Sequence, residues 1–201
     1  PYSRMLAELA SGRCALSGTS LWSADLDAPG LRASSVLIPE GRFGAGLYTS
    51  PDNARALAAR TRADLGPLRA VSNRNWKPDW RVLGALGLAE LRHVQNWDSM
   101  VRTLLAGRAD LVLAPFQPGE EMVLQHAEGT LVPIPEVKVF LYGARAFGLA
   151  RAGPGQEELA RALERGLSAL RAEGRIERAY RECGFYTPRV RAWRTLNPKR
   201  E

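Results

Sequence analysis

Polar and aromatic side chains gather in three short segments that each follow an expected strand. Ser17–Trp22 offers hydroxyls, exposed amides and an indole ring, Asn73–Lys77 offers amides and two cations ahead of a helix, and Ala114–Phe116 follows a buried strand. Ligands of open α/β sheets bind beyond the carboxyl ends of strands. We therefore expect a small polar ligand to be bound by Thr19, Ser20, Trp22, Asn73, Arg74, Asn75, Trp76, Pro115 and Phe116.

Each of these residues also has a purely structural interpretation. Trp22 and Trp76 can fill gaps in the core, and Ser20, like the threonine before it, can form a turn. Arg74 can be a solvated loop charge. Asp110 lies between an expected helix and strand, where we expect it to hold the turn rather than to meet a ligand.

Catalytic and metal-binding patterns are scarce in this sequence. His93 and His126 are the two histidines, and neither has ligand spacing from Cys14 or Cys183, so we expect no metal site. There is no nucleophile elbow, no GxGxxG and no phosphate loop. We therefore expect a non-enzyme without a cofactor, in which Asp25 is the one acid that a catalytic alternative could use. The cysteines are interpreted as buried thiols, with a disulfide left open for an oxidising compartment.

The composition is that of a soluble globular protein, with 45% hydrophobic and 24% charged residues among 201 and a net charge of +7. The arginines are scattered over expected helices and interleaved with acids, which is typical of solvated helix faces. Zinc-finger spacing, a recognition-helix signature and aromatic RNA-binding motifs are lacking, so we expect no nucleic-acid partner. No run of about 18 apolar residues predicts a transmembrane helix. The chain opens directly on an amphipathic helix, so we expect that an export signal has been removed or was not included.

Hydrophobic periodicity and turn residues predict alternating helices and strands. Helices are predicted at 2–13, 53–65, 80–86, 98–106, 156–171 and 176–183. The stretch 14–22 is predicted to be a short strand that runs into a polar loop, and further strands are predicted at 34–38, 43–49, 68–72, 91–95, 109–114, 137–142 and 146–150. Between 68 and 114 the alternation predicts a parallel sheet covered by helices. The stretch 115–135 is predicted to be turn-rich, and the tail 188–201 to lie over the surface.

Three motifs in this order resemble the type II periplasmic substrate-binding proteins, the family that contains polar amino-acid receptors of ABC transporters. The C-terminal motif is the strand Phe147–Ala150, then the helix 158–174, then a short helix that carries Tyr180 and ends before Gly184. The others are the helix–Gly-Arg-Ala-Asp–strand unit 100–114 and the similar unit 2–22. The resemblance implies a two-lobed α/β fold of mainly parallel sheets flanked by helices. It places lobe one at 1–47 and 145–201, lobe two at 48–144, and hinge strands between the lobes.

Two features depart from the family pattern. Family members begin with a strand, a helix and a second strand that are missing before Tyr2, so roughly 50 residues of lobe one are expected to be absent. The sequence is then partial, another copy supplies that part, or lobe one is reduced. Amino-acid receptors also carry an arginine a few residues past the Gly-Thr loop that binds the ligand's α-carboxylate. That position falls near Asp25 here, and the nearest arginine, Arg32, is out of register, which disfavours an ordinary α-amino acid.

The leading hypothesis is an extracytoplasmic, periplasmic solute-binding protein that captures a small polar molecule between two lobes. Closure of the lobes would present that shape to a membrane transporter or sensor. One alternative is a periplasmic dehydratase-like enzyme on the same fold. A second is the ligand-sensing domain of a regulator. The identity of the ligand and the oligomeric state stay open.

Overall fold

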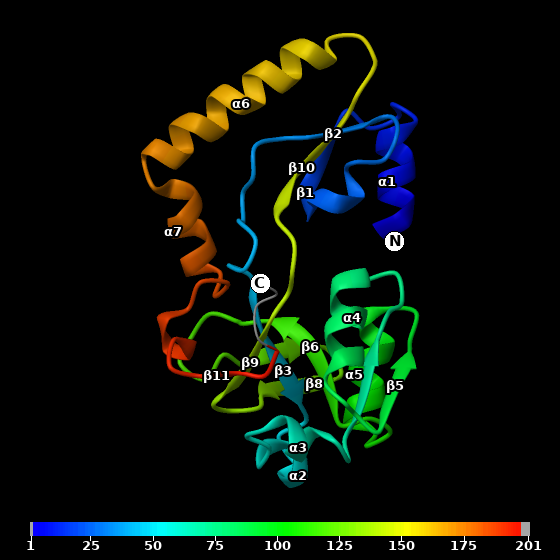
Figure 1. The fold of residues 1–201 in the computed structure, drawn as a ribbon, viewed down its shortest axis with the longest axis vertical. Coiled ribbons are helices and arrows are strands. Elements are labelled where there is room, and N and C mark those ends of the chain that lie inside the picture. Colours follow the sequence, from blue (N-terminus) through cyan, green and yellow to red (C-terminus); the bar gives the residue numbers. More distant parts are fainter. Residues whose placement is uncertain (1, 198–201) are drawn as a thin grey trace. The chain divides into compact units, whose positions relative to one another are not determined.

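The computed structural model describes residues 2–197, and the chain divides into two compact units (Figure 1). Unit 1 contains the residues up to Arg42 and Tyr142–Ala179, and unit 2 contains Phe43–Leu141 and the residues from Tyr180 onward. The predicted lobe boundaries fall at 47/48 and 144/145, and the corresponding borders of the two units fall at Arg42/Phe43 and Leu141/Tyr142. Of the described residues, 180–197 lies in unit 2, where Arg194 and Thr195 pair with a strand, whereas the sequence placed this segment in lobe one.

Unit 1 is built on a three-stranded antiparallel sheet with the order β1-β10-β2. Its elements are α1 (Tyr2–Ala10), β1 (Leu16–Trp22), the 3₁₀ turn η1 (Ser23–Asp25), β2 (Leu31–Ala33), β10 (Arg145–Ala150), α6 (Gln156–Ala172) and α7 (Arg175–Glu182), the last of which runs into unit 2. Helix α1 packs on β1 and β10 through the buried Leu9 and the half-buried Met5 and Leu6. The sheet in this unit is therefore antiparallel, unlike the mainly parallel sheets that we predicted.

A glycine allows the core of unit 1 to close over β10. A Cβ atom on Gly148 would lie 2.7 Å from a Leu26 methyl group and 2.9 Å from a Leu21 methyl group. Both leucines are buried with Leu9 and Leu31 in one apolar cluster. The apolar residues of the loop after β1 can pack onto the sheet because no side chain occupies that point.

Unit 2 contains a larger mixed sheet with the order β11-β9-β3-β6-β4-β5. Its elements are β3 (Gly44–Thr49), α2 (Ala54–Leu57), α3 (Arg62–Leu65), β4 (Arg69–Ser72), α4 (Lys77–Ala85), β5 (Glu90–His93), α5 (Trp97–Leu105), β6 (Leu111–Pro115), β7 (Leu124–His126), β8 (Gly129–Pro133), β9 (Val137–Phe140), the 3₁₀ turn η2 (Pro188–Val190) and β11 (Arg194–Thr195). Strands β4, β5 and β6 are parallel, as predicted, and β3 is antiparallel to β6. The carboxyl ends of β4, β5 and β6 therefore share one edge.

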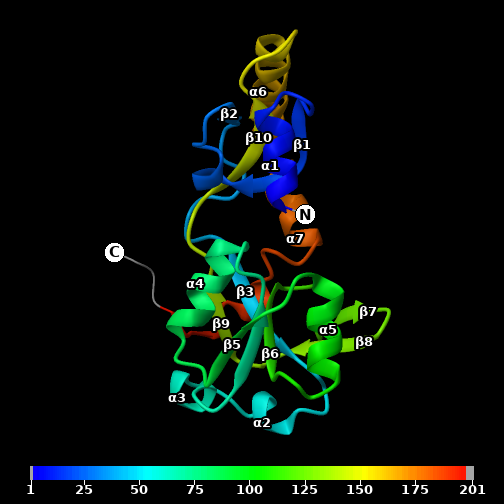
Figure 2. The same ribbon diagram turned by 90° about the vertical axis from the view of Figure 1, so that its right-hand side faces the viewer.

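The helices of unit 2 pack against this sheet, with α4 on β4 and α5 on β4 and β6. Figure 2 shows the β7–β8 hairpin beside α5, where β8 also pairs with β3. The main core joins Tyr48, Val71, Met100 and Leu131, all fully buried. Of the residues that the structure describes, no helix combines the length and the apolar character needed to cross a membrane.

Side-chain hydrogen bonds account for two places where the predicted elements were wrong. The helix predicted over 53–65 is broken, because the Thr61 hydroxyl accepts the Asp64 N–H at 3.3 Å and Asp64 accepts the Thr61 N–H at 2.9 Å. This capping box starts a new helix. No strand forms over the predicted range 34–38: β2 ends at Ala33, and beyond it the Ser34 side chain replaces the backbone pairing, since its hydroxyl accepts the Phe147 N–H at 3.0 Å. The β7–β8 hairpin, inside the stretch predicted to be turn-rich, was missed.

Candidate functional site

An arginine stacked on a tryptophan lies at the carboxyl end of β1 in unit 1. Trp22 ends β1 and pairs with Arg145, the first residue of β10. The guanidinium carbon of Arg145 lies 4.8 Å from the centre of the indole ring, which is within cation–π range. Its Nε donates to Ser20 Oγ at 3.1 Å, and its Nη2 donates to the Ser20 carbonyl oxygen. Two strands therefore fix the plane of one cation at this edge.

Tyr2 and Asp25 form a second polar pair in the same unit. The Tyr2 hydroxyl donates to Asp25 Oδ2 at 2.8 Å and accepts the Trp22 N–H at 3.3 Å. Burial, and then the hydrogen bond to Asp25, raises the pKa of Tyr2 far above its ordinary value, although the Trp22 N–H and the charge of Arg145 oppose this. Tyr2 is therefore a neutral hydrogen-bond donor to Asp25, and the positive charge of Arg145 acts on its hydroxyl.

The three predicted site residues of unit 1 lie within β1 rather than in a loop. Ser20 and Trp22 share one face, because side chains two residues apart along a strand point the same way, and both contact Arg145. Trp22 is 7% exposed, so its ring is a platform for the arginine more than an open surface. Thr19 is exposed, and its carbonyl oxygen accepts the Ser17 hydroxyl at 2.8 Å.

In unit 2 the loop after β4 is held by a buried asparagine. Asn73 Nδ2 donates to the Gln95 carbonyl oxygen at 2.6 Å, and Asn73 Oδ1 accepts the Asn75 N–H at 2.8 Å. The side chain therefore ties the loop after β4 to the loop after β5. At 6% exposure, Asn73 fixes the backbone that presents Arg74 and Asn75, which are both exposed.

Arg74 belongs to a stack of rings at this edge. Its guanidinium carbon lies 5.3 Å from the centre of the Trp80 ring, and the Trp80 and His93 rings meet edge to face at 6.4 Å. The Arg74 N–H donates to His93 Nδ1 at 3.3 Å. Helix α4 begins directly after this loop, and Trp76 at its N-cap provides no side-chain cap. The dipole of a helix start favours anions, but in this first turn Pro78 has no N–H to offer and Asp79 adds a negative charge.

The other predicted residues of unit 2 are closer to the core. Trp76 is half-buried and packs against the main core, as its structural interpretation required. Phe116 is 1% exposed and meets Trp193 edge to face at 5.6 Å. Pro115 is half-buried, and its carbonyl oxygen accepts Gln117 Nε2 at 3.0 Å. Asn73, Arg74 and Asn75 are thus brought together, while Phe116 faces inward.

No protein family model matches the chain, and no curated protein sequence matches it either. Solved structures do match. The periplasmic VFT2 domain of Bordetella pertussis BvgS has a TM-score of 0.64 at 19% identity, over 96% of this chain and 73% of that one. An amino acid ABC transporter substrate-binding protein from Streptococcus pneumoniae, bound to L-arginine, has a TM-score of 0.61 at 19% identity, over 88% and 70%. The fold is that of the type II periplasmic binding proteins.

A third match is the ancestral amino acid-binding protein AncCDT-1, a precursor of cyclohexadienyl dehydratase. Its TM-score is 0.60 at 14% identity, over 91% of this chain and 74% of that one. Identities of 14–19% relate these proteins at the level of the fold. Below, unit 1 is called lobe one and unit 2 is called lobe two.

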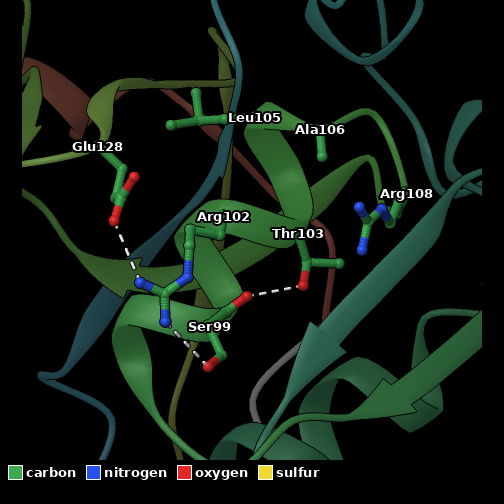
Figure 3. Close-up of a pocket in the computed structure, with 7 residues that line it drawn as sticks. All are labelled: Ser99, Arg102, Thr103, Leu105, Ala106, Arg108 and Glu128. Carbon is green, nitrogen blue, oxygen red and sulfur yellow. Dashed lines mark hydrogen bonds and ion pairs between the residues drawn. The ribbon is translucent and has the colours of Figure 1, made fainter.

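A pocket of about 490 Å³ lies on lobe two, away from the predicted residues. Figure 3 shows the side chains that line it, which lie on α5, just beyond its end and in the turn of the β7–β8 hairpin. Arg102 contacts Glu128 at 3.1 Å, and the Thr103 hydroxyl donates to the Ser99 carbonyl oxygen at 2.6 Å. The charge of Arg102 is thus already balanced within the pocket. None of the predicted binding residues lines it.

Among the described residues, the cysteines and histidines do not form part of a metal-binding group. Cys14 and Cys183 are both exposed and free, which corrects the interpretation as buried thiols, because each lies just beyond the end of a surface helix. His126 Nε2 contacts Asp98 at 3.0 Å, and its Nδ1 accepts the Glu128 N–H at 3.1 Å. Within residues 2–197, no group of three His, Cys, Asp or Glu side chains could hold a metal ion.

Two residues of the lobe-one cluster escaped the sequence analysis. Arg145 is 125 residues from Ser20 in sequence, and only the pairing of β1 with β10 brings them together. Tyr2 was assigned to the apolar stretch of a helix, and its hydroxyl reaches Asp25 from that helix. The available signal was Arg145 itself, a charged residue directly before the predicted strand 146–150.

Proposed function

We propose that the protein is an extracytoplasmic solute-binding protein that captures a small polar solute with its two lobes for a membrane transporter or sensor. Within this proposal, the solute carries a carboxylate or another anionic group. The BvgS domain is periplasmic and the streptococcal protein serves an ABC transporter, and both facts support the location and the partner that we propose.

The stack of Arg145 on Trp22 is the main observation that supports an anionic solute. A guanidinium suits carboxylate and phosphate groups because its donors form a planar fork. Ser20 and Trp22 fix the plane of this fork before any solute arrives, and such preorganisation lowers the entropy lost on binding. Asp25 occupies the position where the resemblance leads us to expect an arginine. Arg145, from β10, provides a positive charge beside Trp22 instead.

Lobe two contributes the second set of contacts in this proposal. Arg74 and Asn75 are exposed on a loop whose backbone Asn73 holds. These groups lie at the edge where the carboxyl ends of β4 and β5 meet, which is where open α/β sheets bind ligands.

A thermal-shift screen followed by calorimetry tests the proposal, with dicarboxylates, amino acids, sugars and polyamines as the panel. A solute that binds only the native state raises Tm, and we expect this from a carboxylate-bearing class and not from polyamines. Arg145→Gln should weaken binding of the best solute by roughly 10- to 100-fold, because a charge-assisted hydrogen bond is lost. Arg161→Gln, an exposed arginine of α6 in the same lobe, is the matched control and should bind as the wild type does.

Two outcomes would contradict the proposal. Either no class in the panel raises Tm, or Arg145→Gln binds the best solute as tightly as the control. Incubation with cyclohexadienyl acids tests the enzymatic alternative separately. We expect no turnover, and turnover that Asp25→Ala abolishes would favour a dehydratase instead.

A further inference from the structure

The segment 184–197 runs along lobe two, and we call it the C-terminal strap. Its β11 pairs in parallel with β9, with Arg194 opposite Val137. At its end, Asn197 Oδ1 accepts the Phe140 N–H at 2.9 Å, and Asn197 Nδ2 donates to the Phe140 carbonyl oxygen at 2.8 Å. The second half of the strap is therefore hydrogen-bonded along the whole of β9.

A buried lysine joins β9 to the first half of the strap. Lys138 is 8% exposed, and its Nζ donates to the Val190 carbonyl oxygen and, at 3.1 Å, to the Arg191 carbonyl oxygen. Burial lowers the pKa of Lys138, and a buried ammonium group without acceptors is costly. The strap supplies those acceptors, so the two segments stabilise each other.

The strap also covers the loop that follows β6, residues 116–122, which we call the β6 loop. Phe116 and Met122 of this loop are buried in one cluster with Val190, and Trp193 of the strap packs against that cluster. The strap enters over the loop at Gly184, whose φ is +88°. A Cβ atom there would lie 2.4 Å from the carbonyl carbon of Gln117, so only glycine permits this approach.

The β6 loop is held on its inner side by a tyrosine. The Tyr48 hydroxyl donates to the Met122 carbonyl oxygen at 2.9 Å and accepts the Gln117 N–H at 3.2 Å. Met122 has φ 51°, a left-handed conformation that a non-glycine residue keeps only when its surroundings impose it. The core on one side and the strap on the other provide those surroundings.

We propose that the C-terminal strap is a positioning element for the β6 loop, and through it for the edge of lobe two where β6 ends at Pro115. Its hold on the loop stands on the contacts above. Its effect on solute binding rests on the proposed function, since the β6 loop follows a strand of the edge that carries Arg74 and Asn75.

Hydrogen exchange followed by mass spectrometry tests this proposal on the full chain. Trp193→Ala should raise the exchange rate of peptides from 116–122 by about tenfold or more, since a local opening requires less free energy once the contacts that close it are removed. Peptides from β4 should keep wild-type rates. Trp193→Phe retains an aromatic ring against Phe116 and should restore most of the protection. Arg191→Ala is the matched control, because the structure uses its carbonyl oxygen and leaves its side chain exposed.

Gly184→Val disrupts the contact between the strap and Gln117 at the other end of the strap. It should give the same rise in the hydrogen-exchange rate of 116–122. The proposal is overturned if 116–122 keeps wild-type rates in both variants while 188–197 exchanges faster. Should Trp193→Ala fail to fold, Trp193→Leu keeps apolar volume without the ring contact and takes its place.

A binding measurement separates this proposal from the proposed function. For a solute that the wild type binds, Trp193→Ala should lower affinity by roughly 3- to 10-fold, about 1 kcal/mol of lost preorganisation. If the wild type binds no member of the panel, the proposed function fails, and the exchange rates of 116–122 still decide the role of the strap.

Discussion

The two edges of the lobe-two sheet carry similar polar residues in opposite circumstances. At the amino edge of β4, Asp110 accepts the Arg69 N–H at 2.8 Å and Arg69 Nε at 3.0 Å, and it accepts Asn53 Nδ2 at 3.3 Å. At the carboxyl edge, Asn73 uses its amide on backbone groups and leaves the neighbouring Arg74 exposed on a fixed loop. Asp110 and Arg69 thus pair with each other and stabilise the fold, whereas Arg74 is the cation that the proposed function assigns to solute binding.

Removing the charge of Asp110 should have the largest effect on stability. Asp110→Asn should lower the free energy of unfolding at pH 7 by about 2 kcal/mol, because hydrogen bonds to a charged acceptor become neutral ones. Burial tends to raise the pKa of Asp110, but the hydrogen bonds and charge of Arg69 outweigh this and hold the pKa below its ordinary value. Denaturant unfolding of variant and wild type measures the difference.

The dependence of this difference on pH provides the check. Because the pKa of Asp110 is lowered on folding, its stabilising effect is present above about pH 4 and is lost as the pH falls through the folded pKa. The two unfolding free energies should therefore converge in acid. Asp52→Asn, an exposed carboxylate of the same lobe, is the control and should differ little from the wild type. A difference that persists unchanged to pH 2 would show that the charge of Asp110 is not the cause.

Truncation of Asn73 should have an intermediate effect, and it tests whether the carboxyl edge is braced. Asn73→Ala leaves the Gln95 carbonyl oxygen and the Asn75 N–H without their partner, which should lower the free energy of unfolding by about 1 kcal/mol. Asn75→Ala removes an exposed side chain and keeps the N–H, so it is the control. If the two variants are equally stable, Asn73 does not hold the loop more firmly than the exposed Asn75 does.

Sequence periodicity was sufficient for the elements whose contacts are local. The helix–strand unit 97–115 and the long helix α6 repeat apolar residues at their own period, and both were predicted to within a few residues. Thr61 shows where periodicity fails, since its capping box interrupts a continuous helical pattern. Neither failure nor success here depended on distant parts of the chain.

The candidate site was harder to predict because its partners are remote in sequence. Arg145 and Ser20 are 125 residues apart and come into contact only because β1 pairs with β10. No sequence motif in either segment predicts this pairing. Phe116 was predicted to face a ligand, but it is covered by Val190 and Trp193 from the tail. The tail was expected to lie over the surface, so nothing in the sequence pointed to an apolar cover for that ring.

Arg74 should show the smallest effect on stability and the clearest separation of stability from binding. Arg74→Ala removes a partly solvated cation–π contact with Trp80, which is worth on the order of 0.5 kcal/mol at an exposed site. If the arginine meets the solute, affinity should fall by about 10-fold at nearly unchanged stability. Calorimetry with the best solute of the panel and denaturant unfolding measure the two quantities on the same variant.

Arg81→Ala provides the matched control, since Arg81 is an exposed arginine on α4, the helix that Arg74 precedes. It has the same charge as Arg74 but does not lie on the loop that Asn73 holds. An equal loss of affinity in both variants would mean that the net charge of lobe two attracts the solute, and the carboxyl edge would lose its special role. A loss confined to Arg74→Ala would instead assign binding to the loop that Asn73 holds, which is the distinction between the two edges in its sharpest form.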